Sequence, residues 1–64
     1  MPWDETRYPP SMKRLPPLVR AKAIEIANAL LEEGYDEGMA IRVAIAKAKE
    51  WAVRHGVTLP PRRR

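Results

Sequence analysis

Cysteine is absent from this chain of 64 residues, and histidine occurs only once. Without cysteine the chain can form neither a disulfide nor a thiolate metal site, and a single histidine excludes a multi-histidine metal centre. No apolar run approaches the roughly 20 residues that span a bilayer, and the first residues lack the basic start and apolar stretch of a signal peptide. We therefore predict a cytoplasmic protein that holds no metal or other cofactor and does not contact a membrane.

The net charge is concentrated at one terminus. The chain carries twelve basic and eight acidic residues, a net charge of +4. Three of the basic residues are Arg62, Arg63 and Arg64, and without them the net charge falls to +1. Because two prolines precede these arginines and cannot continue a helix, residues 57–64 are predicted to form a flexible basic tail. Such a tail would either contact phosphates or serve only as a solubilising terminus.

Proline is concentrated near the start of the chain, where four of the seven prolines lie in residues 9–17. Long regular elements are excluded there. The segment nevertheless carries four apolar or aromatic side chains, which a disordered tail usually lacks: Trp3, Tyr8, Met12 and Leu15. Residues 1–16 are therefore predicted to form an ordered, extended, proline-rich arm that packs on a helical body. Within the arm, Ser11 is predicted to cap one short turn.

The first predicted helix runs from about Pro17 to Glu33. Proline fits the first turn, where its missing N–H is no loss, and Gly34 stands where a left-handed residue commonly ends a helix. Apolar residues recur with a helical period and form a broad stripe: Val19, Ala23, Ile24, Ile26, Ala27, Leu30 and Leu31. Polar side chains are predicted to lie on the opposite face: Glu25, Asn28 and Glu32.

Asp36 is a favourable N-cap for a second helix, which is predicted to run to about His55 and to stop at Gly56. One face of this helix is rich in alanine, and it is the candidate self-association face: Ala40, Ile41, Ala44, Ile45, Ala48, Trp51 and Ala52. Because only two or three residues are expected to connect the helices, they should pair antiparallel or at a strong angle. The predicted fold is all-α, a two-helix antiparallel hairpin over residues 17–56 with the N-terminal arm packed on it.

Two helices and an arm make a thin core. A domain of about 60 residues buries only about 60% of the surface that its unfolded chain exposes. Helical hairpins of this size are marginal without oligomerisation or unusually good packing, and each apolar stripe is wider than one facing helix requires. A homodimer is therefore predicted. The alternative is a monomer in which Trp3 and Tyr8 anchor the arm over the remaining apolar surface.

The charged side chains are predicted to separate along the hairpin. Acidic residues gather at the predicted turn: Glu32, Glu33, Asp36 and Glu37. Basic residues gather at the open end and on the tail, and they are the candidate phosphate contacts: Arg14, Arg20, Lys22, Lys49, Arg54, Arg62, Arg63 and Arg64. This separation favours an antiparallel dimer, or contact with nucleic-acid phosphates whose affinity would fall steeply with salt. An ordinary solvated surface would give the same pattern.

No group of residues in the sequence indicates catalysis. His55 lacks an evident nucleophile or carboxylate partner, and a histidine near a helix C-terminus is favourable to the helix dipole. Ser11 is better suited to a turn or a cap than to nucleophilic attack. The acidic cluster lacks the alternating oxygen ligands of a calcium loop. We therefore predict no catalytic, cofactor-binding or metal-ligating residue, and no enzyme.

Several short motifs resemble those of a group of small uncharacterised bacterial proteins. The resemblance spans roughly residues 2–52 and lies in a Pro-Trp start, a Tyr-Pro-x-Ser-Met-Lys stretch and two helical segments: residues 2–3, 8–13, 19–35 and 48–51. A looser similarity to the ChaB family of cation-transport regulators lies in the step Leu15-Pro16 before an alanine-rich helix, without that family's longer middle insertion. The resemblance implies a bacterial protein and no established activity. The sequence thus predicts a non-enzymatic, self-associating bacterial interaction module, and the alternative is a weak, salt-sensitive nucleic-acid-binding protein.

Overall fold

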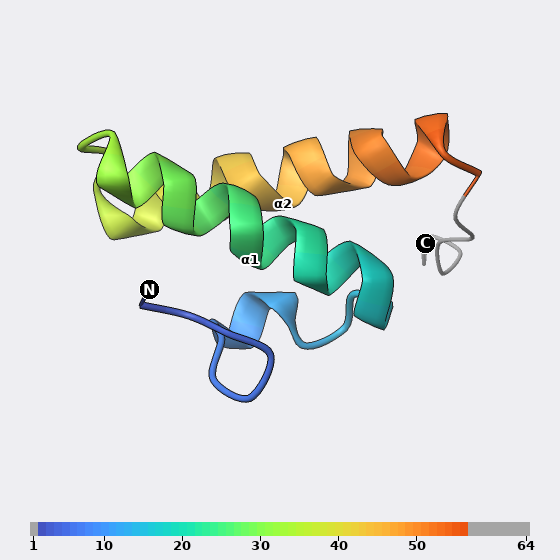
Figure 1. Cartoon of the computed structure of the whole chain (residues 1–64), viewed down its shortest axis with the longest axis horizontal. Helices are drawn as coiled ribbons and strands as arrows, with labels where there is room; N and C mark the ends of the chain where they lie inside the picture. The colour runs from blue at the N-terminus through green and yellow to red at the C-terminus, as the bar shows by residue number, and fades with distance from the viewer. Residues whose placement is uncertain (1, 57–64) are drawn as a thin grey trace, which may run out of the picture.

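Two antiparallel helices form the body of the protein in the computed structural model, which describes residues 2–56 (Figure 1). Helix α1 spans Pro17–Glu32 and helix α2 spans Glu37–Arg54. A short 3-10 helix, η1, spans Pro10–Met12 in the arm. The predicted all-α helical hairpin is confirmed, whereas the tail predicted over residues 57–64 lies outside the described residues. In the part of the chain described, neither helix combines the length and the apolar composition needed to cross a bilayer.

Local sequence explains where α1 lies. Pro17 occupies its first turn, where a proline ring fits the helical φ and no hydrogen bond is lost. The helix ends at Glu32, and Glu33 closes it as the C-cap, one residue earlier than predicted. Gly34 follows with a φ of 103°, the left-handed conformation expected of it. Four residues, 33–36, then separate the helices, rather than the two or three predicted.

The ends of α2 also follow from single residues. The Oδ1 atom of Asp36 accepts a hydrogen bond from the backbone N–H of Met39 at 2.9 Å, so Asp36 is the predicted N-cap. The helix ends at Arg54 with His55 as its C-cap. Gly56 has a φ of 73°, and this left-handed conformation prevents the chain from continuing as a helix.

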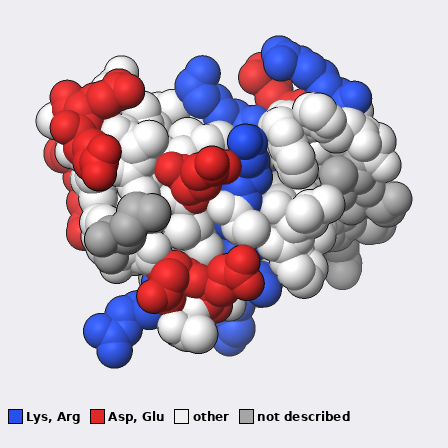
Figure 2. Space-filling view, viewed as in Figure 1, with Lys and Arg blue, Asp and Glu red and all other residues white. Residues whose placement is uncertain are grey.

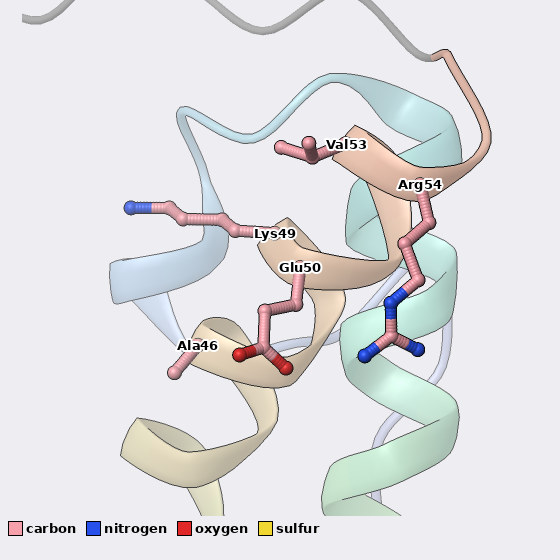
Figure 3. A pocket seen from close by; sticks show the side chains of 5 residues that line it. All are labelled: Ala46, Lys49, Glu50, Val53 and Arg54. Carbon is pink, nitrogen blue, oxygen red and sulfur yellow. The ribbon is translucent and has the colours of Figure 1, made fainter.

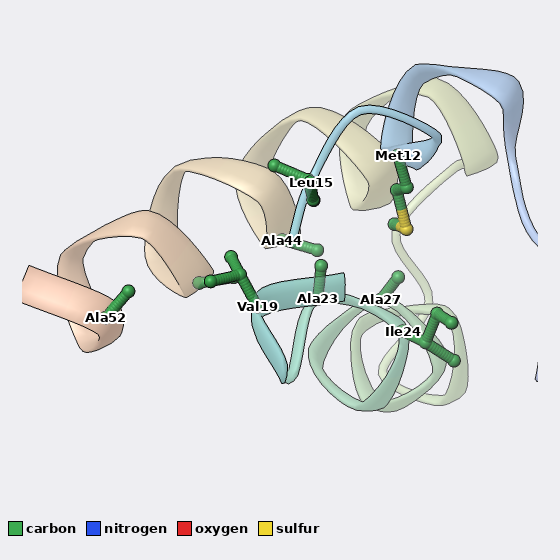
Figure 4. Close-up of a cluster of buried hydrophobic side chains, with 9 residues drawn as sticks. Met12, Leu15, Val19, Ala23, Ile24, Ala27, Ala44 and Ala52 are labelled. Carbon is green, nitrogen blue, oxygen red and sulfur yellow. The ribbon is translucent and has the colours of Figure 1, made fainter. Parts of the chain in front are cut away.

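The core lies where α1, α2 and the arm meet (Figure 4). Helix α2 contributes alanine at every fourth position, and these alanines are fully buried: Ala40, Ala44, Ala48 and Ala52. Because alanine is small, it lets the backbones of paired helices approach closely. Met12 from the arm and Val19 from α1 are the largest fully buried side chains among the described residues. The core is therefore small, and the arm supplies one of its two largest fully buried side chains.

The arm differs in one detail from its predicted form. Ser11 lies within η1, and Pro9 is the N-cap, without a side-chain hydrogen bond. The prediction that Ser11 caps a short turn is therefore wrong, because the preceding prolines start the 3-10 helix earlier. Asp4 and Arg7 pair as an isolated bridge ahead of it. Hydrogen bonds from Thr6, above all from its hydroxyl, hold the pKa of Asp4 below the ordinary value.

Asn28 lies in the interior, although its sequence position predicted the opposite face of α1. Its side chain is buried, with 4% of its surface exposed. The Nδ2 atom donates to the Trp3 carbonyl at 3.0 Å, and the Oδ1 atom accepts from the Trp3 N–H at 3.3 Å. The prediction fails because the arm covers this face. One amide side chain thereby pairs with both backbone groups of Trp3 and fixes the start of the arm on α1.

Candidate functional site

The structure divides the candidate self-association face of α2 into two parts. Its four alanines are buried inside the hairpin, so a second copy cannot reach them while the chain keeps this conformation. Ile41, Ile45 and Trp51 are half-buried against the core cluster. These three residues are the part of the face that a partner can still contact.

Trp51 meets α1 at one edge of the hairpin. The Nζ atom of Lys22 lies 5.5 Å from the centroid of the Trp51 ring, within cation–π distance, and the His55 ring centroid lies 4.9 Å from the same ring. Leu18 precedes Lys22 by one turn on the same face of α1 and is 58% exposed. We call the surface formed by Leu18, Lys22, Trp51 and the half-buried Ile26 the open side.

The arm runs along a different side of the hairpin. In Figure 3 the part of the arm that contains η1 lies on the side toward which Lys49 extends, and Arg54 extends toward α1. Arg54 follows Trp51 by three residues and Lys47 precedes it by four, so both flank Trp51 on the open side. Both side chains are exposed. The open side is thus a partly apolar surface whose border carries an excess of basic side chains, with the acidic Glu25 and Glu50 beside Lys22 and Arg54.

Two of the candidate phosphate contacts have internal partners. The Nη1 atom of Arg20 donates to the backbone oxygens of Leu15 at 3.0 Å and Lys13 at 3.3 Å. Its guanidinium also lies 4.8 Å from the centroid of the Tyr8 ring. Arg20 therefore holds the arm in place. Lys22 pairs with Glu25 at 3.2 Å, in addition to its contact with Trp51.

The other candidate phosphate contacts do not form one site in the described structure. Arg14, Lys49 and Arg54 are exposed, but Arg14 belongs to the arm while Arg54 lies on the open side. Arg62, Arg63 and Arg64 are outside the described residues. On the face drawn in Figure 2, basic side chains alternate with acidic ones over the middle of the hairpin, whereas acidic side chains gather at the end where α1 and α2 connect.

The acidic end consists of exposed residues from both helices and their connection: Glu32, Glu33, Asp36 and Glu37. Asp36 is engaged as the N-cap of α2. Among residues 2–56, no group of three or more His, Asp or Glu side chains is placed to hold a metal ion. The acidic end is therefore best described as a charged surface of the hairpin.

Two shallow hollows lie on the surface of the described residues. One, of about 450 Å³, lies on the outer surface of α2 (Figure 3) and is lined by Ala46, Lys49, Glu50, Val53 and Arg54. The other, of about 220 Å³, lies between the arm and α1 and is lined by Trp3, Asp4, Glu5, Ala21, Ile24, Glu25 and Asn28. Neither described lining pairs a nucleophile with a base. Neither hollow therefore supports a reaction type.

The fold and surfaces define a small all-α hairpin stabilised by an N-terminal arm. The chain is similar to the uncharacterized protein YdaT of Bacillus subtilis (strain 168), with 60% identity over 52 residues. The matched region covers 81% of this chain, and the chain spans only 35% of the length of that relative. No family model matches the chain, and no solved structure matches it.

Proposed function

We propose that the protein is a small, non-enzymatic bacterial interaction module that associates with a second copy of itself. The open side carries this proposal, because Leu18 is 58% exposed one turn before Lys22, and the half-buried Trp51 lies against Lys22. The core supports it as well, since small helical scaffolds commonly need oligomerisation to supplement a core of this size. Burial of the open side by a partner would remove apolar surface from water.

Sedimentation equilibrium of the full chain tests this function directly. We expect the weight-average mass to rise from 7.3 kDa toward twice that value as the concentration increases from about 10 μM to about 1 mM. The range is chosen because a modest interface gives weak association. A mass of 7.3 kDa at every concentration would contradict self-association.

The similarity to YdaT is compatible with a module but assigns no activity. A region 60% identical to most of this chain occupies about a third of that longer protein, as expected of a unit that is used within larger polypeptides. The looser similarity to the ChaB family stays a hypothesis, and a role in cation transport is not part of the proposal.

Nucleic-acid binding is a second candidate function, supported by the exposed Arg14, Lys49 and Arg54 and by the three terminal arginines of the sequence. The measurement is fluorescence polarisation with a labelled single-stranded oligonucleotide at low and at physiological salt. If the tail drives binding, deletion of residues 62–64 should abolish it and leave the oligomeric state intact. Raising the salt should weaken it steeply. Absence of binding by the full chain at low salt would exclude this candidate.

A further inference from the structure

We infer that the open side binds a second copy of the chain in antiparallel orientation, with the acidic end of each copy against the basic border of the other. This inference rests on the proposed function and specifies its surface and geometry. The apolar contact would be centred on Leu18 and Trp51. Two hairpins joined in this way would form a four-helix arrangement, a common solution for amphipathic helices with short connections.

Burial distinguishes the open side from the other faces of the hairpin. The groove beside the arm is already filled, since Met12 is fully buried and Leu15 is 9% exposed. The outer face of α2 carries an exposed Val53 between charged side chains. On the open side, by contrast, Leu18 is exposed one turn before Lys22, and Trp51, which lies against Lys22, is covered only in part. A partner there would contact two large apolar side chains, Leu18 and Trp51, whereas the outer face offers the smaller Val53 and Ala46.

Charge complementarity favours a second copy of the chain as the partner of the open side, and it favours the antiparallel orientation. Arg54 and the contact of Lys22 with Trp51 lie toward the end of the hairpin where α1 begins and α2 finishes, and Lys47 lies nearer the middle of α2. Glu25, which pairs with Lys22, and Glu50, which lies beside Arg54, offset part of this charge, but basic residues are in excess. The complementary charges of this chain are at the opposite end, where Glu33 and Glu37 are exposed. An antiparallel second copy brings these opposite charges together, and a two-fold axis makes every such contact twice. A parallel copy would instead place like charges against each other, which is unfavourable.

Substitution of Leu18 by glutamate tests the surface. Leu18 is in the first turn of α1 and largely exposed, where a carboxylate is compatible with the helix dipole, so Leu18→Glu should leave the hairpin folded. We expect its dimer dissociation constant, measured by sedimentation equilibrium, to rise at least about tenfold because the substitution occurs twice in the interface. The matched control is Val53→Glu, at a residue that is 69% exposed on the outer face of α2, and it should change the dissociation constant less than about twofold.

A charge exchange tests the orientation. Arg54→Glu alone should weaken the dimer, and Glu33→Arg added to the same chain should restore it. Within one copy these residues lie at opposite ends of the hairpin, so the second substitution can compensate for the first only across an antiparallel interface. Circular dichroism of each variant verifies that the helices are retained.

The outcomes separate this inference from the proposed function. A full chain that stays monomeric overturns both. A dimer that Leu18→Glu weakens no more than Val53→Glu overturns the open side as the interface, while self-association stands. A dimer that is weakened by Leu18→Glu but is not restored by the charge exchange overturns the antiparallel arrangement. Weakening by Leu18→Glu together with restoration by the double variant is the result we expect.

Discussion

Truncation of Met12 to alanine is expected to lower the free energy of unfolding by about 2–5 kcal/mol, the range for removing a fully buried large side chain. Met12 is fully buried and joins the arm to the core that α1 and α2 share. The alanines of α2 cannot refill the space, because their side chains are too short. A domain of this size has a total stability of about 3–10 kcal/mol, so Met12→Ala should remove a large part of it and lower the denaturation midpoint markedly.

Urea denaturation followed by tryptophan fluorescence measures this loss, at one fixed chain concentration because association adds to apparent stability. Met39→Ala is the matched control, since it removes the same side chain from a position that is 41% exposed. The control should stay within about 0.5 kcal/mol of the natural chain. Equal midpoints for the two variants would show that the arm contributes little to the core.

Helix positions were predictable because single residues set them. Asp36 is the N-cap of α2 because its side chain accepts a hydrogen bond from the backbone N–H of Met39. Gly34 and Gly56 adopt the left-handed conformation that few other residues tolerate. Pro17 occupies the first turn of α1. All of these signals act within one helical turn, so they can be recognised from sequence without knowing the tertiary structure.

Features that depend on the arm were not predictable in the same way. Periodicity assigned one buried stripe to α1, but this helix is covered on two sides, by α2 and by the arm. The second side contains Ile24 and Asn28, which are four residues apart and both buried. The helical spacing of Asn28 from the apolar Ile24 was the only feature of the sequence that could have indicated this second buried side. Likewise, the alanines of α2 were assigned to self-association because the sequence cannot distinguish burial within one chain from burial between two.

Replacement of Asn28 by aspartate is expected to lower the free energy of unfolding by about 2–3 kcal/mol at pH 7. The natural amide donates to the Trp3 carbonyl and accepts from the Trp3 N–H. A carboxylate keeps the acceptor but places a second oxygen against the Trp3 carbonyl, in a position that is only 4% exposed. The charge is therefore desolvated and one hydrogen bond becomes repulsive. The start of the arm should loosen first, and this loosening should be measurable as faster hydrogen exchange at the backbone amide of Trp3.

The pH dependence of this variant separates a lost hydrogen bond from a general packing defect. Burial and the facing carbonyl should raise the folded-state pKa of the introduced carboxyl above its unfolded value of about 3.9. The protonated form can donate to the Trp3 carbonyl as the amide does, so its stabilisation is present below about pH 3.9 and is lost as the pH rises through the folded-state pKa. The stability deficit of Asn28→Asp relative to the natural chain should thus shrink on acidification.

Ala29→Asp is the control, because it introduces the same carboxylate at the exposed neighbouring position. Its loss of stability at pH 7 should be smaller, since its side chain does not face the Trp3 carbonyl. A deficit for Asn28→Asp that stays constant from pH 7 to about pH 3 would mean that the hydrogen bonds between Asn28 and Trp3 do not hold the arm.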